Sequence, residues 1–161
     1  MRSPTSAELD RLEASAASWA GTPFCPNSAV KGVGVSCHNL PPAIYFEAGW
    51  LPRFPVPDGP PMHGNAGCRS LMEDFLAGCP HFTDVDPQRL CQTDWRRAIA
   101  AIIQAGDMVL SRPARVPHHL ALALRSGRFI HVQYRGVANI APNLPPVWAT
   151  RLARIYRPNL P

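Results

Sequence analysis

The sequence predicts an α+β domain, in which N-terminal helices pack on a central antiparallel β-sheet. Helical apolar spacing dominates the chain before Gly106, and short β-rich segments dominate after it. The length of 161 residues, with 46% of them apolar, suits one packed core. We therefore expect residues 1–161 to form a single domain.

The first helix is predicted by Thr5-Ser6-Ala7-Glu8, which has the pattern of a capping box. Apolar side chains then recur on one helical face, namely Leu9, Leu12, Ala16 and Trp19. Gly21-Thr22-Pro23 ends this helix, and residues 22–36 are expected to form a loop. A second helix is expected from Cys37 to Ala48, with Gly49 as its C-terminal stop.

After the second helix, the sequence pattern changes from one typical of helices to one typical of β-strands. Residues 50–64 are rich in proline and predict an irregular segment, and helical patterns return at 65–77 and 87–103. Short strands are expected at 108–110, 119–125, 129–134, 137–140 and 151–156. Ser126-Gly127 predicts a tight turn between the second and third of these strands.

Composition narrows the classes of partner. The net charge is +5, but the arginines are scattered and form no long run, which argues against nucleic acid and leaves an anionic polymer such as cell wall. No segment approaches the ~20 apolar residues that span a bilayer. Residues 1–21 predict a charged helix rather than a signal peptide, so the cellular location stays open.

The most informative segment for chemistry is Gly32-Val33-Gly34-Val35-Ser36-Cys37-His38. It places a thiol after a glycine-rich loop and at the expected start of a helix. A helix N-terminus offers partial positive charge and unpaired N–H groups, which favour the thiolate and can stabilise an oxyanion. Cys37 is therefore the candidate nucleophile.

Two strand histidines are candidates for the base and for the residue that orients it. His119 and His131 lie on strands joined by the predicted turn, and the period of two places both on one face of the sheet. His119 would accept the thiol proton, and His131 would orient it as the third member of a triad does. His118 is the alternative base, but the same period places it on the face of Leu120, toward the core.

Five segments in chain order resemble one family: Gly21-Thr22-Pro23-Phe24, Gly32-Val33-Gly34-Val35-Ser36-Cys37, Ala105-Gly106-Asp107-Met108-Val109, His119-Leu120-Ala121-Leu122-Ala123-Leu124 and Gly127-Arg128-Phe129-Ile130-His131. The sequence resembles the NlpC/p60 family of papain-like cysteine peptidases over about residues 7–157. Residues 19–51 look closest to the small stand-alone members encoded with phage tails and gene transfer agents.

The resemblance implies a papain-like fold, in which the helix with the nucleophile packs on the sheet with the base. It implies a cysteine peptidase that hydrolyses an amide in the peptide stem of peptidoglycan, as a γ-D-glutamyl endopeptidase does. Cys37 would attack the carbonyl, His119 would move the proton and His131 would hold the His119 tautomer. No metal or cofactor is implied. The expected partners are peptidoglycan peptides and a phage-tail-like assembly, which leaves a cytoplasmic or a particle-associated location.

Three positions depart from the family pattern and are our predicted substrate-binding residues. Ser36 stands where the family has Asp, so the hydrogen-bond acceptor remains but the charge is lost. Phe24 stands where the family has a Tyr whose hydroxyl lies near the oxyanion, and His38 replaces a Ser and could supply that donor. Pro41-Pro42 also predicts an irregular turn at Cys37, or a helix that begins only after Pro41.

Several alternatives remain open at this point. The same cysteine and histidine would serve an amidase or acyltransferase acting on another substrate. A non-enzymatic tail-assembly or immunity component with a degraded site is a third reading. A zinc site is disfavoured, because its four candidate ligands are widely spaced and include no Cys-x-x-Cys pair: Cys68, Cys79, His81 and Cys91.

Overall fold

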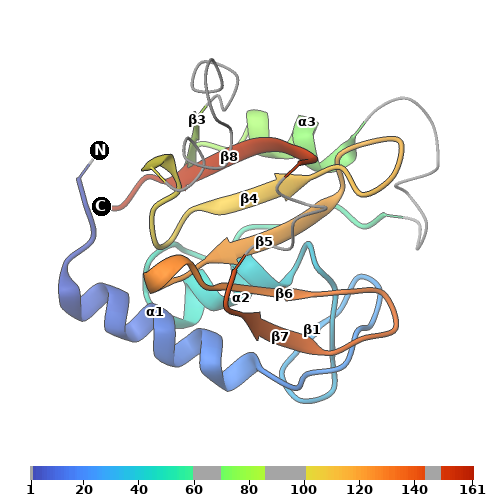
Figure 1. Ribbon diagram of the computed structural model, residues 1–161, viewed down its shortest axis with the longest axis horizontal. Helices are drawn as coiled ribbons and strands as arrows, with labels where there is room; N and C mark the ends of the chain where they lie inside the picture. The colour runs from blue at the N-terminus through green and yellow to red at the C-terminus, as the bar shows by residue number, and fades with distance from the viewer. Residues whose placement is uncertain (1, 60–69, 86–100, 144–149) are drawn as a thin grey trace.

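The architecture is an antiparallel sheet with helices packed against it, seen in a computed structural model that describes residues 2–59, 70–85, 101–143 and 150–161. Within these residues, six strands form one sheet, and helices α1 (Ser6–Trp19) and α2 (Leu40–Glu47) pack on each other and share its main core (Figure 1). This confirms the predicted α+β class. None of the described helices has both the length and the apolar character needed to cross a membrane.

The strands of the main sheet follow the order β3-β8-β4-β5-β6-β7, and every neighbouring pair is antiparallel. Their bounds are β3 (Phe82–Val85), β4 (Met108–Ser111), β5 (His119–Ala123), β6 (Phe129–Val132), β7 (Ala138–Ala141) and β8 (Leu152–Pro158). The five predicted strands are thus confirmed within a few residues, and β3 was not predicted. Strands β1 (Ala29–Val30) and β2 (Gly34–Val35) form a small hairpin inside the segment expected to be a loop.

The turn between β5 and β6 is tight, as predicted. Ser126 has a φ of 59° and Gly127 a φ of 71°. Positive φ at both central residues gives a turn whose twist matches that of paired strands. The turn therefore sets the register in which β5 and β6 meet.

Helix α1 begins at the predicted capping box. The Glu8 backbone N–H donates to the Thr5 hydroxyl at 3.3 Å, and the Thr5 N–H donates to the Glu8 carboxylate at 2.8 Å. Its predicted apolar face is buried at Leu12, Ala16 and Trp19. The helix thus covers the core as its spacing indicated.

Helix α2 begins at Leu40, so the expected start at Cys37 is wrong, whereas the alternative of an irregular turn at Cys37 agrees with the structure. Pro41 and Pro42 fall in its first turn, where a missing N–H breaks no helical hydrogen bond. The helix ends at Glu47, and Gly49 follows with a φ of 71°, in line with the predicted stop. Cys37 therefore lies in the turn before the helix.

Helix α3 (Leu71–Ala77) covers only part of its predicted range. The Ser70 hydroxyl accepts a hydrogen bond from the Glu73 N–H and so caps the helix. Residues 65–69 of the expected helix, and residues 87–100 of the next one, lie outside the described residues.

The two faces of β5 and β6 pack into different clusters. Leu120, Leu122 and Leu124 join the main core beneath the helices, as predicted. Ala121, Ala123 and Phe129 belong to a smaller cluster on the opposite face, which is also the face of His119. The histidines are thus carried on the face turned away from the main core.

The segment before β4 ties α2 to the sheet. The Tyr45 hydroxyl donates to the Gly106 carbonyl at 2.7 Å, and a side chain at Gly106 would meet the Trp50 ring within 2.3 Å. The Asp107 carboxylate, 1% exposed, accepts two hydrogen bonds from Arg157 at 2.7 and 2.8 Å. The Ala105-Gly106-Asp107 motif therefore has a structural role.

Candidate active site

The turn that holds Cys37 is capped by Ser36. The Ser36 hydroxyl accepts hydrogen bonds from the backbone N–H and the side-chain amide of Asn39, at 3.3 and 2.9 Å. The Leu40 N–H closes the turn on the Ser36 carbonyl at 3.0 Å. Ser36 is only 3% exposed, so in this structure its hydroxyl organises the Cys37 turn.

The sulfur of Cys37 lies against the start of β5. The thiol donates to the His118 carbonyl with 3.8 Å between Sγ and the oxygen. Burial raises the pKa of Cys37 to about 11, against an opposing effect from the backbone of Leu120, of Cys37 itself and of His38. Burial, with only 9% of the side chain exposed, therefore favours the thiol and opposes the preference for the thiolate that a helix N-terminus would give.

His119 and His131 lie side by side on one face of the sheet, as their spacing predicted. Their ring centroids are 5.7 Å apart in an edge-to-face arrangement. Burial lowers the pKa of His119 well below its ordinary value, and the neighbouring His131, His118 and His38 lower it further. Burial also lowers the pKa of His131 to about 4. Both rings are therefore neutral at pH 7, the form in which an imidazole can accept a proton.

His38 and His118 contact the same short stretch of backbone. The His38 ring donates from Nε2 to the His118 carbonyl at 2.8 Å, and the His118 ring donates from Nδ1 to the Val116 carbonyl at 2.9 Å. A neutral imidazole has a single N–H. A neutral His38 therefore has no second N–H with which to replace the hydroxyl that Phe24 lacks.

Phe24 lies beside Val35 of β2 and packs against a tyrosine that the sequence analysis missed. The Phe24 N–H donates to the Gly136 carbonyl at 2.8 Å. Its ring meets the ring of Tyr134 edge-to-face, with the centroids 5.4 Å apart. Tyr134 is 55% exposed and lies two residues after the end of β6, so the continuation of the histidine strand was the signal that could have found it.

The structure thus gathers most of the predicted residues at one end of β5. Cys37, His38 and His118 meet through the His118 carbonyl, and His119 is the next residue along the chain. Among the described residues, no group of three acidic, histidine or cysteine side chains is arranged to hold a metal ion. Cys68 and Cys91, from the disfavoured zinc set, lie outside those residues.

Comparison with protein-family models and with curated proteins finds no match. Solved structures do match. An NlpC/P60 family protein from Bacillus cereus has a TM-score of 0.58 and 19% identity, over 100% of this chain and 42% of that one. The peptidoglycan hydrolase RipB of Mycobacterium tuberculosis has a TM-score of 0.53 and 17% identity, over 100% of this chain and 74% of that one.

A third match shows that a protein can have this fold without being an enzyme. RipD of Mycobacterium tuberculosis, described as a non-catalytic NlpC/p60 domain protein adapted to peptidoglycan binding, has a TM-score of 0.52 and 18% identity, over 95% of this chain and 98% of that one. The chain spans less than half the length of the Bacillus cereus protein. At such low identities the similarity concerns the fold. The chain therefore has the fold of NlpC/p60 domains, which a peptidoglycan hydrolase and a non-catalytic protein share.

Proposed function

We propose that this protein is a cysteine hydrolase that cleaves an amide bond in peptidoglycan stem peptides, in the manner of a γ-D-glutamyl endopeptidase. The supporting observation is the position of the Cys37 sulfur, 3.8 Å from the His118 carbonyl oxygen and so beside the start of the strand that carries His119. Cys37 is the nucleophile, His119 the general base and His131 the residue that positions His119.

The proposed reaction starts from a neutral thiol and a neutral imidazole. His119 accepts the thiol proton as the Cys37 sulfur attacks the substrate carbonyl, and the proton then passes to the leaving amine. The resulting thioester is hydrolysed by a water molecule that His119 deprotonates, which frees the sulfur. Turning the thiol from the His118 carbonyl to His119 is the first movement that the resting geometry requires.

Substrate binding is assigned to the positions around the Cys37 turn. Ser36 stabilises the turn by accepting a hydrogen bond from Asn39. Phe24 lies beside β2, and its ring packs against the ring of Tyr134. His38, whose ring bonds to the His118 carbonyl, is assigned a contact with the substrate by its place next to Cys37. The uncharged Ser36 favours a substrate whose recognition does not depend on a free amine. We also propose that residues 1–161 act as a single domain.

Binding to peptidoglycan without cleavage is the second candidate function. It is supported by the burial of Cys37, which raises its pKa to about 11, and by the non-catalytic RipD, which shares the fold. An amidase or acyltransferase acting on another substrate would use the same three side chains. Assembly with a phage tail or gene transfer agent remains a prediction of the sequence.

Digestion of purified sacculi separates these functions. We expect the wild-type protein to release soluble muropeptides, with mass spectrometry identifying the bond, and Cys37→Ala to release none while still sedimenting with sacculi. Cys25→Ala, which removes an exposed thiol, is the matched control and should keep full activity. Release by Cys37→Ala at the wild-type rate would exclude the mechanism, and binding without release by the wild type would favour the second candidate.

A further inference from the structure

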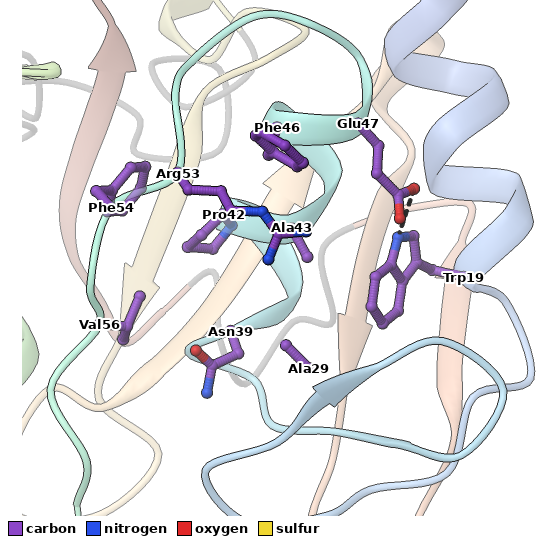
Figure 2. A pocket seen from close by; sticks show the side chains of 10 residues that line it. All are labelled: Trp19, Ala29, Asn39, Pro42, Ala43, Phe46, Glu47, Arg53, Phe54 and Val56. Carbon is purple, nitrogen blue, oxygen red and sulfur yellow. Dashed lines mark hydrogen bonds between the residues drawn. The ribbon is translucent and has the colours of Figure 1, made fainter.

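A pocket of about 190 Å³ lies on the side of α2 that faces away from the sheet. Asn39, Pro42 and Phe46 line it from α2 and its N-cap, and Arg53, Phe54 and Trp19 line it from the flanks (Figure 2). The residues of α2 that pack into the core are different ones, including Leu40, Ile44 and Tyr45. The pocket therefore lies on another side of α2 than the core, and none of Cys37, His119 and His131 lines it.

One side of the pocket is formed by the segment 51–59, which is held to the rest of the protein at Phe54 and at Gly59. The Phe54 ring packs against Phe75 and Phe82, with centroids 6.3 and 5.7 Å away. The Asn27 side chain exchanges two hydrogen bonds with the backbone of Gly59, at 3.1 and 3.2 Å. These anchors hold the segment across α2, so the pocket does not depend on a bound partner to keep its shape.

The two charged side chains in the pocket differ in what they can offer a ligand. The Glu47 carboxylate already accepts hydrogen bonds from Lys31 at 2.6 Å, from the Trp19 indole at 3.0 Å and from Ser15 at 3.1 Å. The Arg53 guanidinium lies over the Phe46 ring, with Cζ 4.3 Å from the centroid. Stacking engages the face of the guanidinium and leaves the N–H groups at its edge for an acceptor.

The ion pairs of the described arginines show which guanidinium groups a carboxylate already occupies. Within the described ranges, five arginines reach a carboxylate: Arg2, Arg125, Arg128, Arg154 and Arg157. No ion pair joins Arg53 to a carboxylate in the described part of the chain, and its guanidinium contacts the Phe46 ring instead. A planar guanidinium that stacks on a ring and has no carboxylate partner among the described residues suits a ligand carboxylate, which it can bind with two parallel hydrogen bonds.

We propose that this pocket binds a short peptide through its terminal carboxylate, with Arg53 as the carboxylate-binding residue. The apolar side chains of Pro42, Phe54 and Val56 line the space that a small side chain next to the carboxylate would occupy. Such a carboxylate occurs at the end of a cell-wall stem peptide and at the C-terminus of a protein. The proposal stands whether or not Cys37 is catalytic, because neither Cys37 nor a proposed catalytic histidine lines the pocket; Asn39, which does, also donates to Ser36 in the Cys37 turn.

Titration followed by NMR tests the pocket in the full chain. The Cys37→Ala background prevents turnover of the probes, so failure of the proposed hydrolysis cannot affect the result. The probes are N-acetyl-D-Ala-D-Ala and N-acetyl-L-Ala-L-Ala, each compared with its C-terminal amide. We expect both acids to shift the Trp19 indole and Asn39 side-chain signals with a Kd of about 1 mM, and the amides to bind at least about tenfold more weakly.

The variants assign the effect to Arg53. Arg53→Gln should weaken binding of the acid until its Kd equals that of the amide. Arg135→Gln removes another arginine stacked on an exposed ring and should leave the Kd of the acid unchanged. A preference for the D,D or the L,L acid identifies cell wall or protein as the source of the ligand. Equal binding of acid and amide, unchanged binding by Arg53→Gln, or no shift with either acid would overturn the proposal.

Discussion

The two halves of the proposed site are built in different ways. The β5–β6 hairpin, which carries His119 and His131, is a local structure of alternating side chains joined by one tight turn. The Cys37 turn depends on partners far away in the sequence, since its sulfur contacts the His118 carbonyl and the preceding strand β2 packs against Cys25. The position of the base therefore follows from a short local sequence pattern, whereas the position of the nucleophile depends on contacts made only in the assembled fold.

The largest expected effect lies on the hairpin side. His119→Gln should lower the rate of muropeptide release by at least about 10²-fold, because a general base commonly contributes that much. His118→Gln is the matched control and should lower the rate by less than about tenfold, since the His118 carbonyl rather than its ring contacts Cys37. Thermal unfolding should show both variants to be folded. The reverse order of effects would make His118 the base.

A substitution before the Cys37 turn should act on stability instead. A Cβ at Gly34 would lie 2.5 Å from the Cβ of Cys25, so Gly34→Ala forces β2 away from its neighbour. We expect a loss of about 2 to 3 kcal/mol in the free energy of unfolding, typical of overpacking. Denaturant unfolding measures it, and Cys25→Gly in the same chain should recover most of the loss. Equal losses in the single and double variants would show that the contact is not the cause.

The smallest expected effect is a dependence of stability on pH from the hairpin. The pKa of His131 is about 4 in the folded protein, below the ordinary value of about 6.5, so the unfolded chain binds the proton more readily. This contribution to stability is complete above pH 6.5 and is lost as the pH falls toward 4. We expect a loss of about 2 kcal/mol over that range, less than the full shift, because the unfolded chain is already partly protonated at pH 6.5 and the folded protein becomes protonated near pH 4.

His131→Phe is the control for this effect, since phenylalanine does not titrate. Its free energy of unfolding, measured by denaturant titration at several pH values, should fall less steeply between pH 6.5 and 4 than that of the wild type. Parallel curves for the two proteins would place the pH dependence in other groups.

The elements that the sequence predicted are those with a local cause. The capping box at Thr5 and Glu8 and the alternation of β5 depend on neighbouring residues, and both were found as expected. Strand β3 was missed because, of its four residues, only Phe82 is fully buried, and its partner β8 lies much later in the chain. A short strand without alternation leaves little signal in the sequence.

The errors at the nucleophile have a physical cause of the same kind. The start of α2 at Leu40 reflects Pro41 and Pro42, which were recognised as a source of irregularity without fixing where the helix begins. The charge state of Cys37 depends on how deeply the assembled fold buries its sulfur. Tertiary burial of this kind leaves no pattern in the local sequence.

The place of β8 in the sheet has a consequence for biosynthesis. Strands β4, β5, β6 and β7 are neighbours in the sheet in chain order, so this meander can form while the chain is still emerging from the ribosome. Strand β8 pairs with both β3 and β4, so β3 acquires its place in the sheet only after residues 152–158 have been synthesised. The emergence of β8 from the ribosome thus sets the earliest moment at which the whole sheet can close, and a premature stop before Leu152 would leave the nascent protein with an unpaired edge on β4 open to aggregation.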